Sequence, residues 1–109
     1  MIFSFEDHVQ QIISGKKTQT RRKSDWYQVG QTYSIQEKRA KPAIPEGRIL
    51  ITHKRIEEPR LRISSDDALA EGGYDPGQFE ALYSQMYPGW DIRYAYTFEF
   101  KPTKETEEQ

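Results

Sequence analysis

The segment IRYAYTFEF, residues 92–100, has the clearest strand pattern in the chain. Its large apolar side chains occupy every second position: Ile92, Tyr94, Tyr96, Phe98 and Phe100. Because successive side chains of a strand point to opposite faces, this spacing places all five on one face. A shift of one residue in register would expose the whole set. We therefore expect the segment to lie inside a sheet, with Tyr94, Tyr96 and Phe98 buried.

Two further strand-like segments, 32–37 and 47–56, come earlier in the chain, and the proline-containing segment 39–46 between them is expected to be a loop. The last strand is distant in sequence from these two. Pairing back with them would close a small barrel and remove exposed sheet edges. The order of elements therefore predicts an α+β fold, a small β-barrel with flanking helices.

Helical signals appear in three places. We expect helices that begin at Ser4, at Ser64 or Ser65, and at Asp75-Pro76, because Ser and Asp cap helices and proline suits the first turn. They should end at Gly15, at Gly72-Gly73 and at Pro88. Their apolar faces carry Phe5, Val9, Ile12 and Ile13 in the first helix and Phe79, Leu82, Tyr83 and Met86 in the third.

The chain of 109 residues is long enough for one domain, which we place at residues 1–100, followed by a charged, flexible tail at 101–109. It has no cysteine, so disulfides and Cys-ligated metals are excluded. His8 and His53 stand far from other candidate ligands and are interpreted as structural, and we expect no metal and no cofactor. Without a long apolar run or a secretory signal, the expectation is a cytoplasmic monomer that does not contact membranes.

The net charge of −1 is the sum of two unlike segments. Residues 16–62 hold thirteen Lys and Arg against five Asp and Glu, a net charge of +8. Residues 63–92 hold six acidic residues and no Lys or Arg. The first segment could present a positive face to a polyanion, although both segments could equally be solvated surface.

Residues 15–23, GKKTQTRRK, combine five positive charges with two threonines. Following a helix end, Lys17, Thr20 and Arg22 could project into a common space. Lysine and arginine bind phosphate or a base edge, and a threonine hydroxyl is a nucleophile when a base stands beside it. This pattern favours an anion or nucleobase site. The alternative is a basic surface hairpin whose threonines are chosen for β-propensity.

Two other places attract attention. Glu71 ends a short helix, where a negative charge opposes the helix dipole, so it could have a role elsewhere. A third group of residues could stack on and hydrogen-bond a base, although such aromatic side chains are more often core: Trp26, Tyr27, Gln36 and Arg39.

Taken together, these segments resemble the ASCH domain, a small member of the PUA-like superfamily. The resemblance spans about residues 2–100 and is carried by SGKKTQTRR (14–22), VGQTYSIQ (29–36), GRILIT (47–52), DALAEGGY (67–74) and YAYTFEF (94–100). It implies a PUA-like pseudo-barrel with a cleft beneath the GKKT turn, and a role in binding RNA or nucleobases. Some relatives hydrolyse the N4-acetyl group of acetylcytidine, and another branch is described as cleaving RNA.

The resemblance also implies roles for individual residues. Lys17 and Thr20 match the lysine and threonine of the hydrolysing relatives, and Glu71 is the candidate for their glutamate. We expect Lys16, Arg21, Arg22, Gln36 and Arg39 to bind the ligand. The function expected is recognition of RNA or a nucleoside, with an N4-acetylcytidine amidohydrolase and a ribonuclease as alternatives. A domain that acts only through a protein partner is a further possibility.

Overall fold

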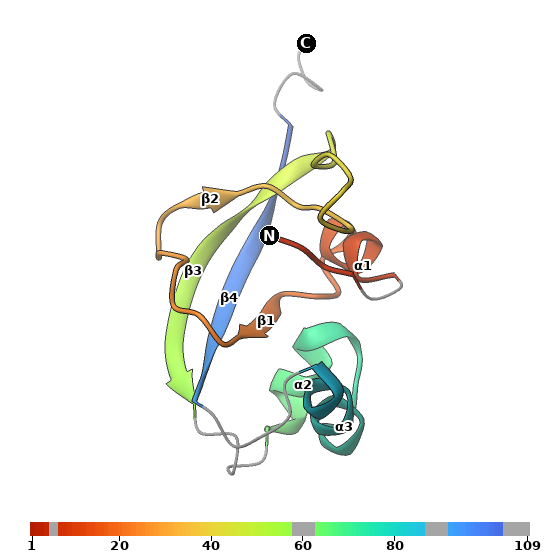
Figure 1. Ribbon diagram of the computed structural model, residues 1–109, viewed down its shortest axis with the longest axis vertical. Coiled ribbons are helices and arrows are strands. Elements are labelled where there is room, and N and C mark those ends of the chain that lie inside the picture. The colour runs from red at the N-terminus through yellow and green to blue at the C-terminus, as the bar shows by residue number, and fades with distance from the viewer. Residues whose placement is uncertain (5–6, 58–62, 87–91, 104–109) are drawn as a thin grey trace.

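In the computed structural model, the described residues are 1–4, 7–57, 63–86 and 92–103, and they form a four-stranded antiparallel sheet with three helices (Figure 1). In chain order the elements are α1 (His8–Ser14), β1 (Gln19–Arg22), β2 (Thr32–Tyr33), β3 (Gly47–Glu57), α2 (Ser65–Gly72), α3 (Pro76–Met86) and β4 (Arg93–Pro102). The fold class is α+β, as the sequence predicts.

The last strand does lie inside the sheet. The strand order is β1-β4-β3-β2, so β4 pairs with β1 on one side and with β3 on the other. The ladder between β3 and β4 runs from Gly47 opposite Pro102 to Glu57 opposite Arg93, with a bulge between Ile51 and His53. Since β4 lies between two strands that come much earlier in the chain, its alternating pattern organises the whole sheet.

The predicted barrel is wrong, because the sheet is open. β2 has only two residues, and in the described part of the chain it does not pair with β1. The backbone beyond β2 bonds to the N-terminal segment instead: Gln36 donates to the Met1 carbonyl and accepts from the Phe3 amide. The N-terminal segment thus uses the hydrogen bonds that a longer β2 would need for closure.

One face of the sheet holds the main core. Tyr96 and Phe98 of β4 are buried there with Ile49 and Ile51 of β3. Met1, Phe3, Val9, Ile12 and Ile35 cover them. The prediction for Tyr96 and Phe98 is confirmed, whereas Tyr94 is only half-buried.

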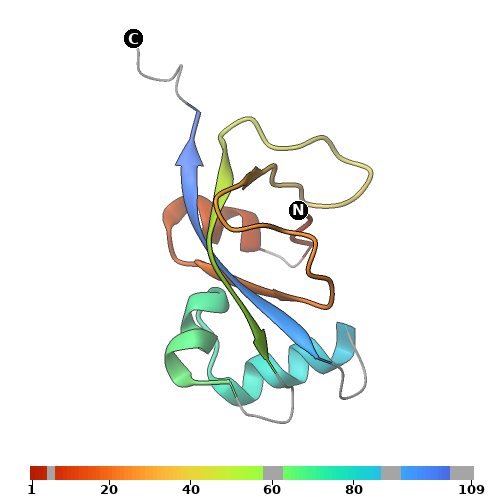
Figure 2. The same cartoon turned by 90° about the vertical axis from the view of Figure 1, so that its left-hand side faces the viewer.

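The opposite face is also covered at the start of β4, so the strand does not alternate between core and solvent. Arg93 and Ala95 are buried there, next to a second apolar cluster of Ile63, Ala68, Phe79 and Tyr83. The members of this cluster come mostly from α2 and α3, which lie together at one end of the long strands (Figure 2). This double coverage gives Arg93 its buried position.

The helix ends follow local chemistry in most places. Ser64 caps α2 by accepting a hydrogen bond from the Asp67 amide, and Asp75 and Gln78 exchange hydrogen bonds at the start of α3. Gly15 and Gly73 end α1 and α2 with φ of 85° and 87°. These predicted ends are confirmed.

The predicted start of the first helix at Ser4 is wrong. α1 begins at His8, because the hydrogen bond from the Phe3 amide to Gln36 keeps the chain extended at that point. At the other end, β4 continues to Pro102, beyond the predicted limit of the domain at residue 100. Three further predicted features lie outside the described residues: Phe5 on the apolar face of the first helix, the end of the third helix at Pro88, and the tail from residue 104.

Core burial on β3 can be tested with two isoleucines of the same strand. Ile51 is fully buried and Ile56 is 67% exposed. We expect Ile51→Ala to lower the free energy of unfolding by about 2–5 kcal/mol, because it removes buried methyl groups and leaves a cavity. Ile56→Ala, the matched control, should change it by less than about 1 kcal/mol. Urea unfolding followed by circular dichroism measures both, and equal losses would contradict the assigned register.

Candidate functional site

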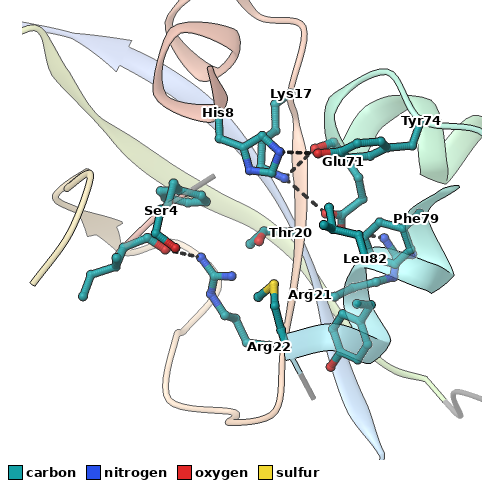
Figure 3. Close-up of a pocket in the computed structure, with 14 residues that line it drawn as sticks. Ser4, His8, Lys17, Thr20, Arg21, Arg22, Glu71, Tyr74, Phe79 and Leu82 are labelled. Carbon is teal, nitrogen blue, oxygen red and sulfur yellow. Dashed lines mark hydrogen bonds and ion pairs between the residues drawn. The ribbon is translucent and has the colours of Figure 1, made fainter. Parts of the chain in front are cut away.

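A cavity of about 40 Å³ lies along β1, between the N-terminal segment, α1 and the pair α2 and α3 (Figure 3). β1 is an edge strand, and side chains from both of its faces reach this cavity. The lining residues are Ile2, Phe3, Ser4, His8, Lys17, Thr20, Arg21, Arg22, Glu71, Tyr74, Phe79, Leu82, Tyr83 and Met86. Lys17, Thr20 and Glu71, predicted to act together, therefore line one cavity.

Lys17 and Glu71 form a buried pair in this cavity. The Lys17 Nζ donates to the Glu71 backbone carbonyl at 2.6 Å and to its Oε1 at 3.1 Å. The amides of Lys17 and Thr18 bond to the carbonyls of Gln11 and Ala70, which fixes the turn after α1 between the two helices. Burial lowers the pKa of Lys17, and the Glu71 carboxylate opposes this effect. Lys17 therefore loses its proton more readily than a surface lysine.

Thr20 is buried on β1, opposite Tyr96 of β4. In Figure 3 it lies between the Lys17–Glu71 pair and Arg22. Thr18, two residues earlier, is only half-buried and does not line the cavity. Thr18 precedes β1, whereas Thr20 lies within the strand, so of the two threonines of the motif only Thr20 reaches the candidate site.

Arg21 points to carboxylates of the protein. Its Nε and Nη2 contact both oxygens of Glu57 at 2.8 and 3.1 Å, and its Nη1 donates to the Glu71 Oε2 at 2.8 Å. The side chain also contacts Gln19 and Asp67. Since all three guanidinium nitrogens donate to protein acceptors, this geometry gives no support to the ligand-binding role predicted for Arg21.

Arg21 belongs to a larger ion network in which four cations meet four carboxylates. Its members are Lys17, Arg21, Arg55 and Arg93, with Glu57, Asp67, Glu71 and Glu80. Arg93 connects β4 to α3 through a two-pronged contact with Glu80, at 3.0 and 2.8 Å. The acidic segment of the chain therefore neutralises part of the basic segment inside the fold.

The network shifts the protonation equilibria of its members. Although burial favours the neutral acid, the guanidinium groups of Arg21 and Arg93 lower the pKa of Glu57 to about 2. Burial likewise opposes the charge of Arg21, and hydrogen bonds and charge from Glu57 and Glu71 raise its pKa. Glu57 is therefore ionised over the whole physiological pH range.

Arg22 differs from its neighbour. Its Nη2 donates to the Ile2 carbonyl at 2.7 Å, and its guanidinium lies 5.0 Å from the centre of the Phe3 ring. In the described part of the chain, no carboxylate pairs with it. Arg22 therefore brings to the cavity wall a positive charge that no carboxylate of the described residues compensates.

The other predicted ligand contacts lie elsewhere. Lys16 is exposed and lies against Gly73, and Arg39 is exposed in the loop after the Ile2–Gln36 bridge. The Gln36 side chain donates to the Lys41 carbonyl. None of these three residues lines the cavity, so the structure does not bring them together with Lys17.

The cavity also contains two functional candidates that the sequence did not indicate: His8, interpreted from the sequence as structural, and Tyr74. The His8 Nε2 and the Tyr74 hydroxyl hydrogen-bond at 2.7 Å inside the cavity. Burial, helped by the charges of Lys17 and Arg22, lowers the pKa of His8 to about 4, so the ring is neutral at pH 7. The sequence feature related to this packing is Gly72. A Cβ atom added at this position would lie 2.8 Å from Gln11 Oε1 and 3.3 Å from His8 Nε2. Gly72 also has a φ of 149°, a backbone conformation that other residues rarely adopt, so glycine suits this approach of α2 to α1.

Within the described residues, no group of three or more His, Cys, Asp or Glu side chains is arranged to hold a metal ion. The same part of the chain contains no helix with the length and apolar character needed to cross a membrane.

The buried His8 predicts a pH-dependent stability. Its pKa of about 4 lies below the 6.5 of the unfolded chain, so the unfolded state binds a proton first as the pH falls. We expect the free energy of unfolding to decrease between about pH 6.5 and 4, and the His8→Gln variant to lack this slope. Urea unfolding at several pH values measures it.

The control for this experiment is His53→Gln, which changes an exposed histidine and should keep the wild-type slope. Both variants should lose stability again below about pH 4.5, where the unfolded chain begins to protonate Glu57, whose folded pKa is about 2. An unchanged slope in His8→Gln would contradict the buried, neutral histidine.

No family model and no curated protein sequence matches the chain. The structure is similar to the ASCH domain from Lactobacillus crispatus JV V101, with a TM-score of 0.72 and 16% identity over 94% of this chain and 79% of that one. It is also similar to protein EF3133 from Enterococcus faecalis V583, of the family model DUF984, with a TM-score of 0.67 and 19% identity over 85% of this chain and 66% of that one. The chain has the fold of the ASCH domain.

Proposed function

We propose that the cavity along β1 recognises a nucleobase or nucleoside, either free or within RNA. The observation that carries this proposal is the convergence of Lys17, Thr20 and Glu71 on one cavity to which Arg22 adds a charge without a carboxylate partner in the described residues. The likeness to the ASCH domain structure supports it at the level of the fold.

The chemistry of the lining suits a flat, polar ligand. Aromatic rings of Phe3, Tyr74 and Phe79 line the cavity and offer apolar surfaces to a base. Lys17 supplies a donor and Glu71 an acceptor next to each other, which matches a base edge that presents an acceptor beside an amino group. Arg22 supplies the positive charge that a phosphate requires.

The size of the cavity sets a condition on binding. Its volume of about 40 Å³ accommodates only a few water molecules, so a base enters only when the cavity widens. Leu82 and Met86 of α3 line it, and Met86 is exposed. Because methionine has an unbranched, flexible side chain, displacement of Met86 is the simplest way to open the site.

The role of Arg22 can be tested with single-stranded RNA. If Arg22 contacts a phosphate, Arg22→Gln should weaken binding for all sequences alike. It should also reduce the slope of log affinity against log salt concentration by about 1. Fluorescence anisotropy titrations at about 50 to about 200 mM salt measure both the affinity and its salt dependence. Arg48→Gln, which changes an exposed arginine outside the cavity, is the matched control. Equal slopes for the two variants would contradict the phosphate contact.

A second candidate function is hydrolysis of an N4-acetylated cytidine. The observation that favours it is a buried lysine with a lowered pKa, bonded to a glutamate and lining the same cavity as a threonine. In this reaction neutral Lys17 accepts the proton of the Thr20 hydroxyl as its oxygen attacks the acetyl carbonyl. Glu71, which accepts a hydrogen bond from the Lys17 Nζ, takes this proton from Lys17 and passes it to N4 as the C–N bond breaks and cytidine leaves. Water then attacks the acetyl ester on Thr20 and gives a proton to Lys17, which returns it to the Thr20 oxygen as acetate is released. Arg22 stabilises the oxyanion.

One assay distinguishes recognition alone from hydrolysis. We expect the wild type to convert N4-acetylcytidine into cytidine, detected by chromatography, if the second candidate applies. Thr20→Ala should then abolish turnover and leave binding nearly unchanged, because it removes the nucleophile. Glu71→Gln should slow turnover while keeping the shape of the side chain.

Thr18→Ala is the matched control, since Thr18 belongs to the same motif but does not line the cavity. Turnover by Thr20→Ala would exclude Thr20 as the nucleophile. If the folded wild type forms no cytidine, recognition alone remains, and Thr20→Ala should then cost only about 1 kcal/mol of binding free energy. Shortening of an RNA oligonucleotide in the same assay would reveal the ribonuclease alternative.

A further inference from the structure

The loop between β1 and β2 exposes a large aromatic side chain. Trp26 is 77% exposed, the largest of the exposed apolar side chains in the described part of the chain. From the sequence, Trp26 and Tyr27 are both possible stacking residues. The structure separates the two, because Tyr27 packs against Tyr33 and Tyr96 with ring centres 5.0 and 5.4 Å apart.

The backbone around Trp26 is fixed to the sheet. The Tyr96 hydroxyl donates to the Ser24 carbonyl at 2.7 Å. The Lys54 Nζ donates to the carbonyls of Asp25 at 2.7 Å and Tyr27 at 3.1 Å, one on each side of Trp26. The indole ring is thus held in solvent by an anchored loop, so that little conformational entropy is lost when a flat ligand stacks on it.

The charges near Trp26 favour a polyanion. Lys54 holds the loop, and Arg22 and Lys23 precede Trp26 in the chain, against one acidic neighbour, Asp25. The residues on either side of Trp26 in the chain are Ser24, Asp25, Tyr27 and Gln28, none of them aliphatic, whereas a surface for a protein partner is typically a broad apolar patch. The combination of an exposed ring and positive charge is typical of sites for single-stranded nucleic acid.

The position of Trp26 relates it to the cavity. Arg22 lines the cavity and stands four residues before Trp26, a stretch of at most about 14 Å of chain. One RNA strand of a few nucleotides can cover this distance. A base held in the cavity would therefore have a neighbour of the same strand within reach of the indole ring.

We propose that Trp26 is a stacking platform for an unpaired base of single-stranded RNA, adjacent to the nucleotide held in the cavity. This inference rests on the proposed recognition function and names its ligand as a strand rather than a free nucleoside. Bases of a duplex are stacked and paired, so they do not offer a free face to the indole. Lys54 is a positioning residue in this arrangement, because it acts through the loop backbone.

The test uses the full chain carrying Trp90→Phe, which leaves Trp26 as the only tryptophan. The probes are the single-stranded RNA hexamer CAACCA, its duplex with the complementary strand, and cytidine monophosphate. We expect the hexamer to quench Trp26 fluorescence strongly and the mononucleotide to bind without comparable quenching. The duplex should bind more weakly than the single strand.

Variants then separate the platform from the cavity. Trp26→Ala should weaken hexamer binding by about 5- to 150-fold, the range for loss of one stacked base. It should leave binding of cytidine monophosphate unchanged. Trp26→Phe should restore part of the hexamer affinity. Leu69→Ala, a matched truncation of an exposed side chain on α2, should change neither.

Each result decides between the proposals. Three results would overturn the stacking platform: hexamer affinity within about twofold of wild type in Trp26→Ala, no quenching by the hexamer, or equal binding of the duplex. Binding of the mononucleotide would still support recognition by the cavity. If neither hexamer nor mononucleotide binds at low salt, the platform and the proposed recognition function both fail.

Discussion

The buried guanidinium of Arg21 connects the sheet to the helices that complete the candidate site. From its place on β1 it contacts Glu57 on β3, and Glu71 and Asp67 on α2. Arg93 extends the same network from β4 to Glu80 on α3. Charges buried in this way are tolerable only when each finds a partner, and removing one partner leaves another charge uncompensated. The position of α2 against the sheet therefore depends on this arginine.

Glu71 connects Arg21 to the candidate site. One of its carboxylate oxygens binds Arg21 and the other binds Lys17, so the structural network and the proposed chemistry share one side chain. Arg21 fixes the orientation of Glu71, and Glu71 in turn opposes the loss of the Lys17 proton that burial favours. A change at Arg21 would therefore alter both the stability of the fold and the protonation of Lys17.

The open edge of the sheet is a second constraint. β1 ends the sheet, and the cavity follows it because the N-terminal segment and α3 approach that edge without pairing with it. A closed barrel would have used this edge for another strand. Beyond the strand, the loop held by Lys54 carries Trp26 into solvent, so one basic stretch of the chain supplies the cavity and the proposed stacking platform.

The features with a local cause could be predicted from the sequence alone. The alternation of residues 92–100 indicated an interior strand, caps and glycines indicated most helix ends, and the spacing of the motif indicated Lys17 and Thr20 as candidates. Arg21 and Arg22 are adjacent in sequence, and their different roles follow from contacts in the folded chain. Their side chains leave opposite faces of β1 and both line the cavity, but Arg21 is held by carboxylates of α2 and β3 while Arg22 has no carboxylate partner among the described residues. The partnership of His8 with Tyr74 and the open sheet likewise depend on contacts between residues distant in sequence, which no local pattern encodes.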